Sequence, residues 1–139
     1  MKIMGIDYGD KRVGVALSDI LGITAQGYKT LENTGGKKLF LGLKEIIEEN
    51  SVEEIVIGLP KNMDSSEGFR ADATKEFAEK LKKYTDKPIV FWDERLTTVA
   101  AHSFLTDLDI RGKKRKALVD TVSAALILEG YLNSKQMKK

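Results

Sequence analysis

The sequence predicts an α/β protein built on a mixed sheet of about five strands, with helices on both faces of the sheet. Two patterns lead to this fold class. The first third of the chain contains three short segments that are typical of strands, one of them with a clear period of two. The remainder alternates helical and strand patterns, so the expected order is βββαβαβα followed by a C-terminal helix. A length of 139 residues fits a single domain over residues 1–139.

The three N-terminal strands are expected at residues 2–7, 12–18 and 25–32. In the second of these, large apolar residues alternate with glycine and alanine, which favours a strand. Gly9, Asp10 and Lys11 form a short turn before it, so the first two strands should make a hairpin.

Apolar residues at helical spacing predict the elements that follow. A helix is expected to run from Leu39 to Asn50, and a short strand to follow at residues 54–58. The next helix should be capped by Ser65 or Ser66 and should present one apolar face, made of Phe69, Ala73, Phe77, Leu81 and Tyr84. The remaining predictions are a strand at 89–92, a helix after Thr97 or Thr98, a basic loop at 107–115 and a last helix over about 116–132.

Composition narrows the class of protein. The chain has no cysteine, which excludes disulfides, thiolate zinc sites and a cysteine nucleophile, and fits a cytoplasmic protein. No apolar run approaches the ~20 residues of a membrane span, so no membrane association is expected. With 23 basic and 21 acidic residues, the net charge of +2 does not by itself indicate nucleic-acid binding.

Basic residues are nevertheless concentrated in one segment. Five of the six residues at 111–116 are Lys or Arg, among them Arg115 and Lys116. Such a run can contact the phosphates of a nucleic acid, and it can equally be a solvated loop.

Three carboxylates are candidates for chemistry. Asp7 is the last residue of one predicted strand and Glu94 follows another, although a turn-forming Asp and a surface Glu would also explain them. Asp120 interrupts an apolar stretch and shares a helical stripe with Ala124, Ile127 and Tyr131, so its side chain should face the protein. Its alternative role is a first-turn acid stabilised by the helix dipole.

Three acids without a nearby thiolate suit a hard cation such as Mg²⁺ or Mn²⁺, which prefers oxygen ligands. The sole histidine, His102, lies inside a predicted helix and is expected at the surface, so Ser-His-Asp chemistry has little support.

Polar loops after two of the strands offer possible phosphate contacts. The loop at 58–68 leads into a helix, where free amides, Asn62 and Arg70 could hold an anion, or where the loop is simply a polar connection. Arg95 lies with two acids in the segment 93–98, between a strand and a helix. Neither a P-loop nor a dinucleotide-binding glycine motif is present.

Taken in order, four motifs resemble the YqgF/RuvX family over nearly the whole chain. These are the opening segment 7–16, the loop 58–68, the segment 93–98, and Asp120 with the apolar residues that follow it through Leu132. The resemblance implies an RNase H-like fold and a metal-dependent nuclease with Asp7, Glu94 and Asp120 as its catalytic acids and metal ligands. It also implies that Lys11, Arg12 and Asn62 lie near the substrate backbone.

This family includes both the nuclease that trims the 5′ end of pre-16S ribosomal RNA and a Holliday junction resolvase. The expected partner is therefore nucleic acid, either structured RNA or branched DNA, bound by a monomer or a homodimer. Two alternatives of other classes remain at this point. One is a phosphotransferase or ATPase, since the actin and sugar-kinase superfamily opens with a similar hairpin, and the other is a non-enzymatic RNA-binding factor in ribosome assembly.

Overall fold

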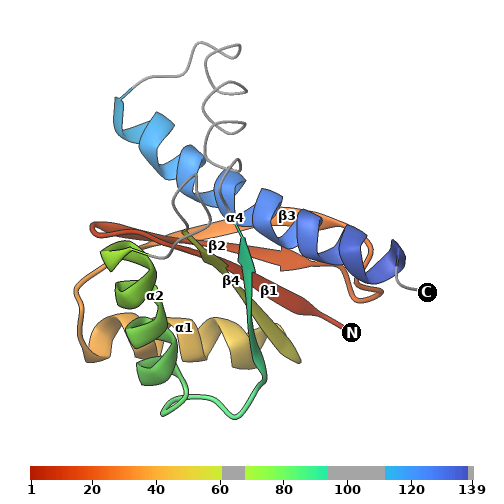
Figure 1. The fold of residues 1–139 in the computed structure, drawn as a ribbon, viewed down its shortest axis with the longest axis horizontal. Helices are drawn as coiled ribbons and strands as arrows, with labels where there is room; N and C mark the ends of the chain where they lie inside the picture. The colour runs from red at the N-terminus through yellow and green to blue at the C-terminus, as the bar shows by residue number, and fades with distance from the viewer. Residues whose placement is uncertain (61–67, 94–111, 138–139) are drawn as a thin grey trace.

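The computed structural model describes residues 1–60, 68–93 and 112–137 (Figure 1). Three strands lead the chain and are followed by alternating helices and strands, as the periodicity predicts. The strands are β1 (Ile3–Tyr8), β2 (Arg12–Ser18), β3 (Ala25–Glu32), β4 (Glu54–Leu59) and β5 (Ile89–Asp93). The helices are α1 (Lys37–Glu49), α2 (Phe69–Leu81) and α4 (Gly112–Met137).

The five strands form one mixed sheet in the order β3-β2-β1-β4-β5. The two hairpins β1/β2 and β2/β3 are antiparallel, while β1/β4 and β4/β5 are parallel. The carboxyl ends of β1, β4 and β5 therefore meet at one edge of the sheet, where ligands bind in many α/β proteins.

Helices cover both faces of the sheet, as predicted. Alternate residues of each strand point to opposite faces. Met4 and Ile6 of β1 belong to the core under α1 and α2, whereas Ile3 belongs to the core under α4. Figure 1 shows α1 and α2 on one side of the sheet and α4 crossing the other side.

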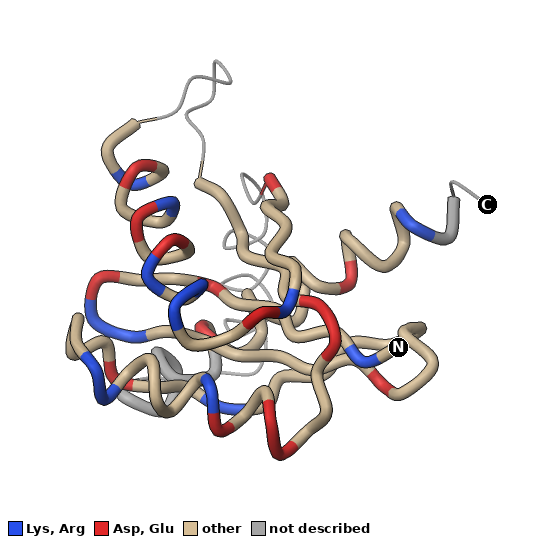
Figure 2. The backbone as a smooth tube through the Cα atoms, turned by 90° about the horizontal axis from the view of Figure 1, so that it is seen from below, with Lys and Arg blue, Asp and Glu red and all other residues tan. Residues whose placement is uncertain are grey.

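Charge on the helices α1 and α2 is mixed in sign. Lysines and glutamates pair along each helix, with 3.8 Å between Lys44 Nζ and Glu48 Oε1 and 3.4 Å between Lys80 Nζ and Glu76 Oε1. Blue and red positions are interspersed along the backbone in Figure 2. These helices therefore present a solvated surface to water rather than a basic patch.

The structure differs from the predicted helices in three places. α4 begins at Gly112 instead of near Lys116, so residues 112–115 of the predicted basic loop are helical. Lys, Arg and Ala are strong helix formers, and this propensity extends the helix. α2 is capped by Gly68 without a side-chain hydrogen bond, so the predicted serine cap at 65 or 66 is wrong, and Phe69 is 78% exposed rather than part of the apolar face.

The predicted helix after Thr97 and the sole histidine lie outside the described residues. Although α4 has 26 residues, none of the described helices contains an apolar stretch able to cross a membrane.

Candidate functional site

Asp7 lies near the carboxyl end of β1, on the face of the sheet that α4 covers. Gly5, two residues earlier, packs against α4, since a Cβ on it would lie 2.8 Å from Leu128 Cβ and 2.9 Å from the Ala124 carbonyl oxygen. Because side chains two apart on a strand share a face, Asp7 points to the same side. In the antiparallel ladder, Asp7 is paired with Gly14 of β2.

Gly14 brings the second carboxylate to the same place. A Cβ on Gly14 would collide with the backbone carbonyl of Asp120 and would lie 3.0 Å from its Cβ. Only a glycine lets the helix backbone approach the strand so closely. Asp7 and Asp120 are therefore both neighbours of Gly14, although they are far apart in the sequence.

Asp120 faces the sheet as its helical stripe predicts. Ala124 and Ile127, four and seven residues later, are fully buried, and the Asp120 side chain is only 16% exposed. Arg12 of β2 provides the compensating charge, with 2.7 Å between its Nε and Asp120 Oδ2. This is a charge-assisted hydrogen bond, which offsets the cost of burying most of the Asp120 carboxylate.

Charged side chains of both signs meet at this position. Two carboxylates, Asp7 and Asp120, share the face around Gly14, while Arg12 supplies one positive charge to Asp120. Within residues 1–60, 68–93 and 112–137, no group of three or more His, Cys, Asp or Glu side chains could hold a metal ion. The third predicted ligand, Glu94, lies outside these ranges, directly after the last residue of β5.

The other predicted contact residues are placed less completely. Lys11 is exposed in the turn between β1 and β2, beside Arg12. Asn62 and Arg95 lie outside the described residues. Arg115 and Lys116 belong to the helical backbone of α4, and their side chains are not among those described.

Asn33, which the sequence patterns did not single out, supports the turn next to Asp7. Its backbone N–H donates to the Lys11 carbonyl at 2.9 Å, and its Nδ2 donates to the Gly9 carbonyl at 2.7 Å. The sequence signal for this role is the turn-forming run Asn33-Thr34-Gly35, in which the Asn33 Oδ1 accepts a hydrogen bond from the Gly35 N–H at 3.0 Å. The β1–β2 turn is thus fixed from the β3–α1 connection.

Comparison with known proteins finds close sequence relatives. The profile of the family described as RuvX, Holliday junction resolvase, matches residues 1–134. A protein from Halothermothrix orenii is 49% identical over 133 residues, which cover 96% of this chain and 95% of the relative. One from Ruminiclostridium cellulolyticum is 51% identical over 134 residues, which cover 96% of this chain and 94% of the relative. Both carry the provisional name pre-16S rRNA nuclease.

Solved structures with the same fold include two resolvases. Thermus thermophilus RuvC in complex with a Holliday junction substrate superimposes with a TM-score of 0.60 at 11% identity, covering 99% of this chain and 96% of that chain. The fowlpox virus resolvase in complex with junction DNA gives a TM-score of 0.54 at 11% identity, covering 97% of this chain and 99% of that chain. At these identities the likeness establishes the fold, and it confirms the predicted RNase H-like sheet.

Proposed function

From the premise that this chain belongs to the RuvX family, we propose that its nuclease activity depends on a divalent metal ion and processes the 5′ end of pre-16S rRNA. A nuclease of this family is a hydrolase that acts on phosphodiester bonds. Relatives that are about half identical over nearly their whole length bear the pre-16S rRNA nuclease name, which supports the choice of substrate.

The observation that carries the metal dependence is the position of two carboxylates beside Gly14. Asp7 and Asp120 would hold Mg²⁺ or Mn²⁺, with Glu94 as the third ligand, because all three offer the oxygen atoms that these ions prefer. A bound ion of this kind supplies a water of lowered pKa and stabilises charge on the phosphate.

The protein's own residues prepare the site for a phosphate. Gly14 lets the Asp120 backbone pack against β2, and Gly9 lets the Arg12 carbonyl approach in the turn that follows β1. Arg12 orients the Asp120 carboxylate through its Nε, and its remaining guanidinium donors are available to a phosphate oxygen, since the side chain is 36% exposed. Lys11, exposed in the adjacent turn, adds a positive charge for the substrate backbone.

Branched DNA is the second candidate substrate. The family description names a Holliday junction resolvase, and two structures with this fold contain junction DNA. Cutting two symmetric strands of a junction would favour a homodimer, whereas trimming one RNA end requires only a monomer.

The test compares the two substrates directly. Purified protein is incubated with a precursor containing the 16S rRNA 5′ end and, separately, with a four-way DNA junction, in the presence of Mg²⁺ or Mn²⁺. We expect cleavage of the RNA, and a loss of at least ~100-fold in rate for Asp7→Asn and for Asp120→Asn. Asp10→Asn, an exposed acid in the neighbouring turn, is the matched control and should retain the wild-type rate.

Three outcomes would contradict parts of this proposal. Equal cutting by wild type and both site variants would eliminate the metal mechanism. Cleavage of the junction alone would replace the RNA substrate by branched DNA. RNA binding without cleavage in either metal, unchanged in the variants, would indicate a non-enzymatic assembly factor.

A further inference from the structure

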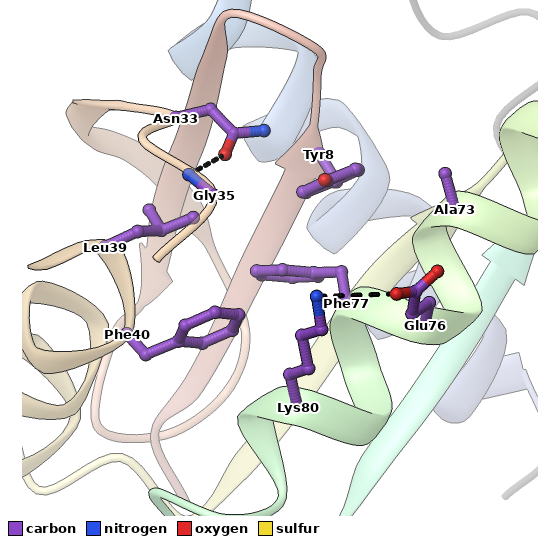
Figure 3. Close-up of a pocket in the computed structure, with 9 residues that line it drawn as sticks. All are labelled: Tyr8, Asn33, Gly35, Leu39, Phe40, Ala73, Glu76, Phe77 and Lys80. Atoms are coloured by element: carbon purple, nitrogen blue, oxygen red, sulfur yellow. Dashed lines mark hydrogen bonds and ion pairs between the residues drawn. The ribbon is translucent and has the colours of Figure 1, made fainter. Parts of the chain in front are cut away.

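A second candidate binding site lies on the opposite face of the sheet, at the same end of β1. Tyr8 follows Asp7 directly, so its side chain points away from α4 and packs against the core under α1 and α2. It lines a cavity of about 120 Å³ together with residues from the β3–α1 connection and the two helices (Figure 3). We propose that this pocket, the Tyr8 pocket, binds one unpaired nucleobase of the substrate next to the phosphate that is cut. This inference rests on the proposed function.

Aromatic rings form one wall of the Tyr8 pocket. Tyr8 and Phe77 are stacked, with 4.4 Å between ring centroids and 26° between planes. Phe77 is stacked in turn on Phe40 at 5.6 Å, and Phe40 on Tyr84 at 5.2 Å. The rings therefore hold each other in fixed orientations, and Tyr8 remains only partly buried. Phe77 and Phe40 are buried in the core, so Tyr8 is the ring that they hold in place for a ligand. A fixed aromatic ring is the feature on which nucleic-acid bases stack, largely independently of their identity.

Polar groups form the remainder of the lining. The Asn33 amide uses one N–H for the Gly9 carbonyl and one oxygen lone pair for the Gly35 N–H. A second N–H and a second lone pair therefore remain for a ligand. Lys80 and Glu76 lie across the cavity from Asn33 and are paired at 3.4 Å (Figure 3). Donors and acceptors on both sides match the edge of a nucleobase, which carries both, better than they match a purely apolar ligand.

The size of the cavity limits the occupant. At about 120 Å³ it is well below the ~300–1,000 Å³ of pockets that enclose drug-sized molecules. A single planar ring system is the ligand of this size that can use an aromatic wall and edge-on polar groups together.

Covalent and hydrogen-bonded connections join the Tyr8 pocket to the candidate metal site. The Cα atoms of Asp7 and Tyr8 are ~3.8 Å apart, as in any trans peptide. Asn33 also holds the turn that follows Asp7, through Gly9 and Lys11. Because the two side chains point to opposite faces of the sheet, a single strand would have to pass around the end of β1, with a phosphate on the Asp7 side and a base on the Tyr8 side. A base can enter only when it is unpaired, so the pocket favours cleavage in single-stranded regions.

The experiment measures base binding without cleavage. Short single-stranded RNA and DNA oligonucleotides carry the fluorescent base 2-aminopurine at one position, which is moved along the strand, and are titrated with metal-free protein. We expect a fluorescence change at one position, and about tenfold weaker binding when that nucleotide is made abasic. Ala73→Leu, which fills the cavity from α2, should remove both effects, whereas Ala73→Ser should retain them.

The proposal concerns the base, so a response with either the RNA or the DNA oligonucleotide supports it. The proposal is overturned if no position responds, or if Ala73→Leu binds the intact and abasic strands as the Ala73→Ser control does. The abasic comparison on wild-type protein decides the question even if Ala73→Leu does not fold. Base binding without any cleavage in Mg²⁺ would support this inference and contradict the proposed function. Cleavage without a base effect would support the proposed function and contradict this inference.

Discussion

At the scale of single residues, Gly14 determines how closely α4 approaches the sheet. The Asp120 backbone occupies the space that a side chain at residue 14 would need, and Asp7 is its partner across the β1–β2 ladder. The absence of one Cβ thus sets the relative position of the two acids. Arg12 then holds Asp120 through a contact between residues 108 positions apart in the chain.

Replacing Gly14 by alanine should move α4 away from β2. The added methyl group meets backbone rather than a flexible side chain, so relief requires a shift of the helix. We expect a loss of about 2 kcal/mol or more in the free energy of unfolding, within the range of overpacked cores. Urea denaturation gives this value.

The control is Gly36→Ala, where a Cβ meets no atom within 4 Å and φ is −128°. This substitution should lower the free energy of unfolding by no more than about 1 kcal/mol, because Gly36 is the N-cap of α1, where alanine is less favourable than glycine but meets no steric conflict. If Gly14→Ala is as stable as this control, the close approach at Gly14 does not constrain the helix.

At the scale of elements, side-chain contacts hold α4 against the sheet near both ends of the helix. Near its start, Asp120 is bound by Arg12. Near its end, the Tyr131 hydroxyl donates to the Glu54 carboxylate of β4, and Lys135 Nζ lies 3.4 Å from Glu54 Oε2 and 5.3 Å from the Tyr131 ring centroid. These contacts fix the direction in which the helix crosses the sheet.

Burial raises the pKa of Tyr131 to about 12, and the hydrogen bond and negative charge of Glu54 contribute to this shift. The folded protein therefore holds this proton more tightly than the unfolded chain, whose tyrosine pKa is about 10. The resulting stabilisation is complete below pH 10 and is lost as the pH rises through 12.

Tyr131→Phe should accordingly remove part of the alkaline pH dependence of stability. Denaturation of wild type and variant between pH 8 and about 12 is the measurement. At pH 8 the variant should be less stable by about 1 kcal/mol, the contribution of one hydrogen bond, and the difference should shrink above pH 10. A difference that stays constant with pH would show that folding does not raise the pKa of Tyr131. Tyr28→Phe, an exposed position, serves as the control.

At the scale of the whole molecule, the candidate metal site includes one residue from the sheet and one from α4. Asp7 belongs to the central strand, and Asp120 to the helix that covers one face. An ion held by both would bind the folded chain and not the unfolded one. Metal binding and global stability should therefore be coupled.

Added Mn²⁺ or Mg²⁺ should raise the melting temperature of the wild-type protein. The expected gain in the free energy of unfolding is about 2.7 kcal/mol at an ion concentration of ~100 times the Kd. The double variant Asp7→Asn, Asp120→Asn should show no rise, whereas Asp10→Asn should respond as wild type does. Calorimetric melting at several ion concentrations measures the effect, and equal stabilisation of all three proteins would place the ion elsewhere.

The sequence by itself determined the strands, most of the helices and the inward orientation of Asp120. These features follow from periods of two and 3.6, which are local properties of the chain. The start of α4 was mispredicted because a basic run was interpreted as a loop although its residues favour helix, and the predicted cap of α2 failed because glycine takes that position.

Only the tertiary structure decided which residues meet. Several contacts join segments that are distant in the sequence. β1 lies between β2 and β4, and the Asp120 backbone packs against Gly14. Arg12 pairs with Asp120, and Asn33 and Phe77 lie beside Tyr8. No local pattern encodes them, because strand order and helix crossing result from burying both faces of one sheet at the same time. The acids could be nominated from the sequence, whereas the close packing that brings Asp120 to Asp7 and the pocket behind Asp7 came from the fold.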